Sequence, residues 1–132
     1  MAKSRVMCAD EIQVFTSKWN IGASGAHTKV TGVPGTGFSG VAETAAGKYT
    51  ITFARGMPVG GLIDLIITHW PAADAANLNP RPTKAGYTAE TASAAATMLY
   101  ETWDNDTTAQ TELASGDQVT ITAVFLKTKP PA

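Results

Sequence analysis

The stretch from Gly47 to Pro71, GKYTITFARGMPVGGLIDLIITHWP, restricts the fold more than any other part of the chain. Tyr49, Ile51 and Phe53 alternate with polar residues, which is the pattern of a half-buried strand. After a turn rich in glycine and proline, the run from Leu62 to Trp70 is almost continuously apolar. This run is too short to span a bilayer, so it predicts a strand that is covered on both faces.

The rest of the chain repeats short apolar segments separated by turns that contain glycine. Further strands are predicted within residues 11–19, 26–31, 38–44, 98–103 and 118–127. The second of these is polar enough for a sheet edge, and Gly40 predicts a bulge in the third. Seven or eight short strands, with no room for helical crossovers, favour an all-β antiparallel β-sandwich, jelly-roll-like or immunoglobulin-like in class. The expected core residues are Tyr49, Ile51, Phe53, Ile63, Leu65, Ile67, Val119, Ile121 and Phe125.

A chain of 132 residues suits one domain, and a domain of this size buries enough surface to form a core. We expect residues 1–10 to form an N-terminal arm and residues 11–132 to form a single β-sandwich domain. A long loop is expected at about 72–93, because that stretch is rich in Ala, Asn and Thr and contains Pro80 and Pro82. Segments of this kind become ordered on binding, so the arm and the loop are expected to make the main partner contacts.

The composition narrows the classes of partner. Charged residues make up only 16% of the chain, so the solvated surface relies on Thr, Ser, Asn and Gly. The formal net charge is -1 and the basic residues are scattered, whereas a nucleic-acid partner needs a stripe of Lys and Arg. Cys8 is the single cysteine, so no internal disulfide is expected. The first residues lack the apolar core of a signal peptide, and we expect folding in a reducing cytoplasm without a membrane partner.

The sequence contains no convincing catalytic, cofactor or metal motif. Residues 35–40, GTGFSG, fit G-x-G-x-x-G, but a strand follows them where the dinucleotide motif requires a helix. His27 and His69 are the only histidines, and neither has further ligands at the spacing of a metal site. A glycosidase pair of carboxylates would have to be assembled from scattered residues. We therefore predict that the protein is not an enzyme and needs no cofactor. The carboxylates considered for such a pair are Asp64, Glu101 and Asp104.

Trp19, Trp70 and Trp103 each fall at the end of a predicted strand. Core closure at the ends of the sandwich is the expected role for at least two of them, and interface anchoring is the alternative, since Trp is enriched in binding hot spots. Asp64 is flanked by apolar residues, and burying it without a partner would cost several kcal/mol. We expect it to face solvent or to pair with an arginine or a neighbouring subunit.

Four short sequence segments that combine turn and strand residues occur together: WNIGASG at 19–25, GTGFS at 35–39, GKYTITF at 47–53 and SGDQVTI at 115–121. In this combination the chain resembles a family of small tailed-bacteriophage virion proteins. The resemblance implies a capsid decoration, or cement, protein, which is a β-sandwich bound outside the major capsid shell. Such a protein ties neighbouring capsid subunits together against internal DNA pressure. The implied location is the virion surface, after synthesis in the host cytoplasm.

The partners implied are the major capsid protein and neighbouring copies of the same chain. A dimer or trimer is expected, because the low charge and the two-sided apolar strand indicate that another subunit covers one sheet face. Lys3 and Arg5 would meet acidic residues, so binding is expected to weaken with salt. The candidate partner-binding residues are Lys3, Arg5, Val6, Trp70, Leu78 and Arg81.

Other functions remain open. A tail or head-fibre structural module would share the same sandwich, and a saccharide-binding module would use Trp70 or Trp103 as a stacking platform. An exposed aromatic row beside polar groups would favour sugar binding, whereas a flat, self-complementary apolar patch would favour assembly.

Overall fold

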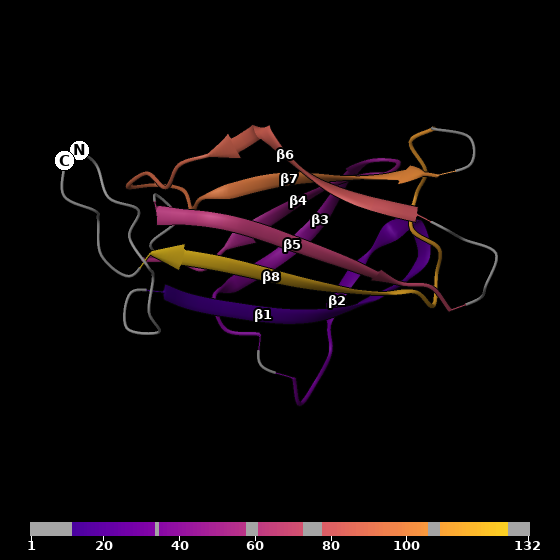
Figure 1. Ribbon diagram of the computed structural model, residues 1–132, viewed down its shortest axis with the longest axis horizontal. Helices are drawn as coiled ribbons and strands as arrows, with labels where there is room; N and C mark the ends of the chain where they lie inside the picture. Colours follow the sequence, from indigo (N-terminus) through magenta and orange to yellow (C-terminus); the bar gives the residue numbers. More distant parts are fainter. Residues whose placement is uncertain (1–11, 34, 58–60, 73–77, 106–108, 127–132) are drawn as a thin grey trace, which may run out of the picture.

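The computed structural model describes residues 12–33, 35–57, 61–72, 78–105 and 109–126. Within these ranges the chain forms eight strands, and β1, β5, β7 and β8 run along the long axis of the molecule (Figure 1). The strands are β1 (Ile12–Ile21), β2 (His27–Lys29), β3 (Phe38–Ala45), β4 (Lys48–Phe53), β5 (Leu62–Trp70), β6 (Leu78–Thr88), β7 (Thr97–Asp104) and β8 (Gln118–Leu126). A short 3-10 turn, Ala23–Gly25, connects β1 to β2.

The strands form two antiparallel sheets of four strands each. Sheet A has the order β2-β1-β8-β5 and sheet B has the order β3-β4-β7-β6. The first and last strands are neighbours in the middle of sheet A, paired from Ile12 opposite Leu126 to Asn20 opposite Gln118. The prediction of an all-β, jelly-roll-like sandwich of seven to eight strands is thus confirmed at the level of two packed antiparallel sheets.

The core lies between the inner faces of the two sheets. The alternation of β4 places Tyr49, Ile51 and Phe53 on its inner face, where all three are fully buried. From the opposite sheet, Phe125 meets Phe53 edge-on, with ring centroids 6.0 Å apart. All the predicted core residues except Ile63 are buried.

The irregular positions of two strands follow from local chemistry. β2 is a short edge strand, as its polar sequence predicted. In β3 the register with β4 shifts between Phe38 and Gly40, so the bulge predicted at Gly40 is confirmed.

The prediction of a long loop at 72–93 is wrong, because Leu78–Thr88 forms strand β6 at an edge of sheet B. Pro80 lies opposite Thr102 of β7, and Pro82 lies opposite Tyr100. The backbone N–H of Thr102 donates to Gly47 on the other side of β7, so Thr102 and Tyr100 direct their backbone groups toward β4.

The residues that lie opposite them in β6 must therefore direct their own backbone away from β7. Both prolines occupy such positions, where a missing N–H removes no hydrogen bond from the sheet. From the sequence alone these prolines predict limited pairing, whereas at the outer positions of an edge strand they are compatible with it.

Candidate interaction surface

One outer face of the sandwich carries most of the exposed large apolar residues that the structure describes. In β1, β5 and β8, alternate residues point into the core, and the residues between them face outward from sheet A. Of these outward residues, Val14, Ile66 and Trp70 are 57%, 48% and 53% exposed. The exposed large apolar residues in the described chain are Val14, Val33, Ile63, Ile66, Trp70 and Tyr87. Four of these six lie on this face, which makes it the candidate interaction surface.

The strand register gathers part of this surface into one patch. Val14 of β1 lies opposite Val124 of β8. Ile12 and Leu126 form the next outward row of the same two strands. On the other side of β8, Asp64 of β5 lies opposite Val124, and the outward isoleucines of β5 lie on either side of this exposed carboxylate. We call this set the apolar patch: Ile12, Val14, Ile63, Ile66, Val124 and Leu126.

A β-bulge explains why Ile63 belongs to the apolar patch and not to the core. By strict alternation with Leu65, Ile63 would point inward. The register with β8 shifts between Leu62 and Asp64, so Ile63 is the extra residue and turns outward, where it is 51% exposed. The prediction of Ile63 as a core residue is therefore wrong, and Leu62 packs against the core near the same position.

β5 is an edge strand, and only its inner side is covered. Its inward residues Leu65 and Ile67 are 5% and 9% exposed, whereas its outward residues face solvent. The prediction that residues 62–70 are covered on both faces is wrong for a single copy of the chain. Sheet B covers the inner side of β5, and no other described segment forms a layer over the outer side.

The other half of this face is polar, and Lys18, opposite Thr120, is its one charge on β1, β5 and β8. The indole N–H of Trp70 donates to Oγ1 of Thr120 at 2.9 Å. Nε2 of Gln118 donates to Oδ1 of Asn20 at 2.8 Å, across the pair of strands β8 and β1. These contacts satisfy side chains with neutral partners, so the surface can approach another protein without removing many charges from water.

The predicted partner-binding residues are not brought together. Trp70 lies on the outer face of sheet A, as an interface residue would. Arg81 is exposed on β6 of the other sheet. Leu78 is 8% exposed and belongs to the hydrophobic core, a position that suits packing and not a partner contact. The remaining candidates lie outside the described residues: Lys3, Arg5 and Val6.

The three tryptophans have three environments. Trp19 is 3% exposed and its indole N–H donates to Oγ of Ser17 at 2.7 Å, so it closes the core as predicted. Trp103 is half-buried and donates to Glu101 at 3.2 Å. Trp70 is the exposed one of the three and the only one on the outer face of sheet A, so this face presents no aromatic row.

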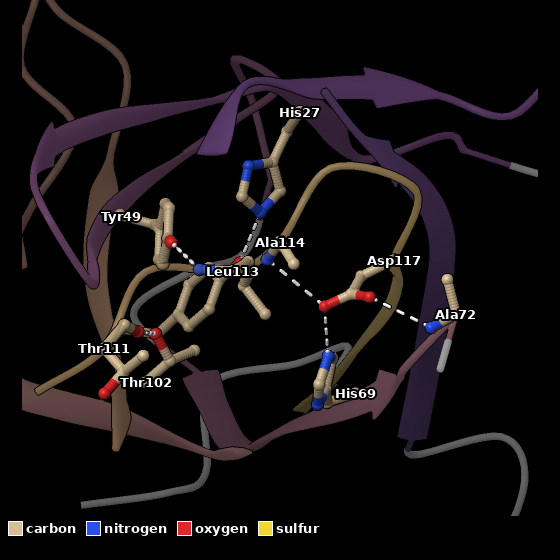
Figure 2. A network of polar contacts seen from close by, with 10 residues as sticks. His27, Tyr49, His69, Ala72, Thr102, Thr111, Leu113, Ala114 and Asp117 are labelled. Atoms are coloured by element: carbon tan, nitrogen blue, oxygen red, sulfur yellow. Dashed lines mark hydrogen bonds and ion pairs between the residues drawn. The ribbon is translucent and has the colours of Figure 1, made fainter. Parts of the chain in front are cut away.

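A polar network joins the two sheets near β2 (Figure 2). Nδ1 of His27 donates to the carbonyl of Gly25 at 2.7 Å, which leaves Nε2 to accept from the hydroxyl of Tyr100. Burial lowers the pKa of His27 to about 4. Tyr49 stacks on Tyr100 at 4.9 Å between ring centroids, and its hydroxyl accepts from the backbone N–H of Leu113. Burial raises the pKa of both tyrosines, whose side chains belong to the core.

Asp117 joins the end of β5 to the turn before β8 through three hydrogen bonds (Figure 2). Its carboxylate accepts from Nε2 of His69 at 2.8 Å and from the backbone N–H groups of Ala72 and Ala114 at 3.0 and 3.2 Å. The side chains of His69 and Asp117 are 4% and 3% exposed. A substrate in solution has no access to a pair buried to this extent, so its evident role is to hold the end of β5 to the turn before β8.

The carboxylates considered from the sequence do not form a pair. Asp64 is exposed on sheet A, whereas Glu101 and Asp104 lie on β7 of sheet B, three positions apart and therefore on opposite faces of that strand. The structure instead brings Glu43 together with Glu112, a pair that no sequence spacing indicated. Partial burial, followed by the hydrogen bond and the charge of Glu112, raises the pKa of Glu43.

A shallow hollow of about 220 Å³ lies beside β6 and β7. This is below the roughly 300–1,000 Å³ of usual small-molecule sites. The lining residues are Arg81, Trp103, Asp104 and Asn105. Among the described residues, no set of three or more His, Cys, Asp or Glu side chains is placed to hold a metal ion. That part of the chain also contains no helix with the length and hydrophobicity needed to cross a membrane.

A scan against protein-family models, a search of curated proteins and a search of solved structures each found no match to this chain.

Proposed function

We propose that this protein is a virion structural protein, a capsid decoration or cement protein that binds the major capsid shell through the outer face of sheet A. The observation that carries the proposal is the gathering of exposed apolar side chains on that face. The phrases shared with small bacteriophage virion proteins favour the same function. The proposed location is the outside of the capsid.

The chemistry of the face suits a permanent, extensive contact. Full burial of one aliphatic side chain contributes about 1.5–3 kcal/mol, and the exposed residues of the apolar patch retain about half of their surface for this purpose. Each copy would therefore bind with modest affinity. A shell offers many equivalent sites, and linked contacts between copies raise the total affinity without any new interaction.

The framework behind the face suits a mechanical role. Sheet A is backed by a core that reaches from Trp19 to Phe125, so the face is held as one rigid unit. A rigid face that spans a junction between capsid subunits would resist their separation under internal pressure. The N-terminal arm remains a second predicted contact, outside the described residues.

The test is co-sedimentation with empty shells of the major capsid protein. Ile66→Lys places a charge in the apolar patch, and Thr50→Lys places the same charge on the outer face of sheet B as the matched control. We expect Ile66→Lys to lower occupancy at least about tenfold, since a lysine cannot be buried there without losing hydration. Thr50→Lys should bind like the parent chain.

Deleting residues 2–9 separates the arm from the face. Reduced occupancy after this deletion, with an unchanged melting temperature, would assign part of the contact to the arm. Equal binding of Ile66→Lys and Thr50→Lys would overturn the proposed face. A tail or head-fibre position would appear as binding to those structures and not to empty shells.

A further inference from the structure

The four sheet edges are protected to different degrees. β2 has only three residues, β3 is interrupted by two register shifts, and β6 carries two prolines on its outer side. Short strands, bulges and edge prolines all hinder pairing with another chain. β5 has nine residues, and beyond the bulge at Ile63 the segment from Leu65 to Trp70 contains no proline and no lysine. β5 is therefore the open edge of the described sandwich.

The hydrogen-bonding direction of β5 follows from the register of sheet A. The backbone N–H of Ile21 donates to the carbonyl of Asp117, whereas the carbonyl of Lys18 accepts from Val30 beside β2, so the odd-numbered residues of β1 direct their backbone groups toward β8. Ile121 lies opposite Ser17, one of these odd-numbered residues, so Ile121 directs its own backbone groups toward β1 and away from β5. The residues of β5 opposite such positions must direct their own backbone groups to the free edge. These residues are Leu65, Ile67 and His69.

One contact supports this direction independently. The backbone N–H of Leu65 donates to the carboxylate of Asp64 at 2.9 Å, as expected of a group that points away from β8. The neighbouring carboxylate thus caps the first outward donor. No described strand is hydrogen-bonded to Ile67 or His69 on that side, although β6 of sheet B packs close to β5.

We propose that β5 pairs with β5 of a second copy, antiparallel, about a two-fold axis at Ile67. This register puts Ile67 opposite Ile67 of the second copy, and Leu65 opposite His69, with their outward backbone groups facing each other. A centre at Leu65 would extend the pairing into the bulge, and a centre at His69 would leave fewer paired residues. The pairing joins the two sheets A into one continuous sheet of eight strands.

The occupant is a second copy because this register matches the outward backbone groups of β5 to themselves and opposes no like charges. In a two-fold interface the same surface of each copy forms both sides, so every residue must be compatible with the residue of the same strand that lies opposite it. Ile66 lies opposite Thr68 of the second copy on the outer face, and Asp64 lies opposite Trp70, so no like charges meet. The apolar patches of both copies then face the same side. The pairing rests on the edge geometry and not on shell binding.

Disulfide trapping tests the register directly. In a Cys8→Ser background, Ile66→Cys and Thr68→Cys are made as separate variants, and the two proteins are oxidised alone and mixed. Opposite residues at non-exchanging positions lie about 4.5 Å apart between Cα atoms, within disulfide range. We expect at least about fivefold more cross-linked dimer in the mixture than in either variant alone. Equal cross-linking in all samples, or none in the mixture, would overturn the register.

A charge test uses the intact chain in solution, without shells. Ile66→Lys with Thr68→Lys opposes like charges across the two-fold axis, whereas Ile66→Lys with Thr68→Glu opposes unlike charges at the same positions. Sedimentation should show the dissociation constant of the first variant raised at least about tenfold over that of the second. Identical dissociation constants, or a parent chain that stays monomeric at about 100 μM, would overturn the dimer while leaving shell binding open.

Discussion

The two outer faces of the sandwich differ in the charge and polarity of their side chains, although both are formed by strands with alternating inward and outward residues. On sheet B, Lys48 and Arg81 both lie opposite Glu101 in neighbouring strands, so charges of opposite sign stand side by side in water. On sheet A, the outward positions of β1, β5 and β8 carry Lys18 and Asp64 as their charges, and the apolar patch occupies much of the rest. One face is suited to remain hydrated, and the other is suited to be covered by protein.

The edges of the two sheets also differ: an edge of sheet B is protected against strand pairing, whereas an edge of sheet A is open. β6 closes its edge with prolines whose backbones point outward, whereas β5 leaves backbone groups free along the same side of the molecule. Exposed apolar faces and open edges both promote association. On sheet A the two features coincide, as the proposed assembly surface requires, whereas the prolines of β6 hinder strand pairing at the neighbouring edge of sheet B.

The largest expected effect tests whether both sheets share one core. Phe53 is fully buried in sheet B and contacts Phe125 of sheet A. Phe53→Ala should lower the free energy of unfolding by about 3–5 kcal/mol, because the large side chain leaves a cavity. Chemical denaturation measures this, with the outward neighbour Thr52→Ala as the control. A loss below about 1 kcal/mol would show that the sheets do not depend on each other.

The next effect tests the polar link between the sheets. The pKa of His27 is about 4 in the folded chain and 6.5 in its ordinary state. Between these values the unfolded chain binds more protons, so stability falls as the pH is lowered from about 6.5 to about 4. The difference between the two pKa values corresponds to a loss of about 3 kcal/mol in the free energy of unfolding, at about 1.4 kcal/mol for each pH unit.

His27→Gln removes the titration and retains hydrogen-bonding groups. Denaturation at a series of pH values should therefore give a flatter profile for His27→Gln than for the parent chain in this window. Other titrating groups are common to both proteins, so the difference between the profiles isolates His27. Parallel profiles would contradict the burial of a neutral ring.

A moderate effect should appear when the β6 edge is opened. Pro80→Ala with Pro82→Ala restores two outward N–H groups and frees the unfolded chain, which should cost about 1–2 kcal/mol in stability. The same change should increase concentration-dependent association, because the edge then resembles β5. Light scattering measures this increase. Unchanged association would mean that the prolines do not protect this edge.

The smallest effect on stability is expected on the outer face of sheet A. Ile66→Lys should change the unfolding free energy of the single chain by no more than about 0.5 kcal/mol, because the side chain is already half exposed. Thermal denaturation at low protein concentration measures this, beside Thr50→Lys on sheet B. A loss above about 2 kcal/mol would show that Ile66 belongs to the fold and not to an interface.

Local sequence determined the strands whose two faces differ clearly. The alternation in β4 and β8 identified Tyr49, Ile51 and Phe125 as inward residues, and Gly40 marked the bulge in β3. These features depend on neighbouring residues only, since a side chain every second position defines one face of a strand. The sandwich class followed from the number of such segments and from the turns between them.

The remaining features of the fold depended on how the strands pair, because the residues next to one another in the sequence do not show which strand will be their partner. Pro80 and Pro82 predict a loop until β6 is known to be an edge with those positions facing outward. Ile63 follows the alternation of the core until the shift against β8 turns it to solvent. The same holds for the apolar patch, whose isoleucines and valines come from three strands. The sequence by itself determined which segments would be buried on one side, and only the tertiary structure decided which apolar side chains were left over for a partner.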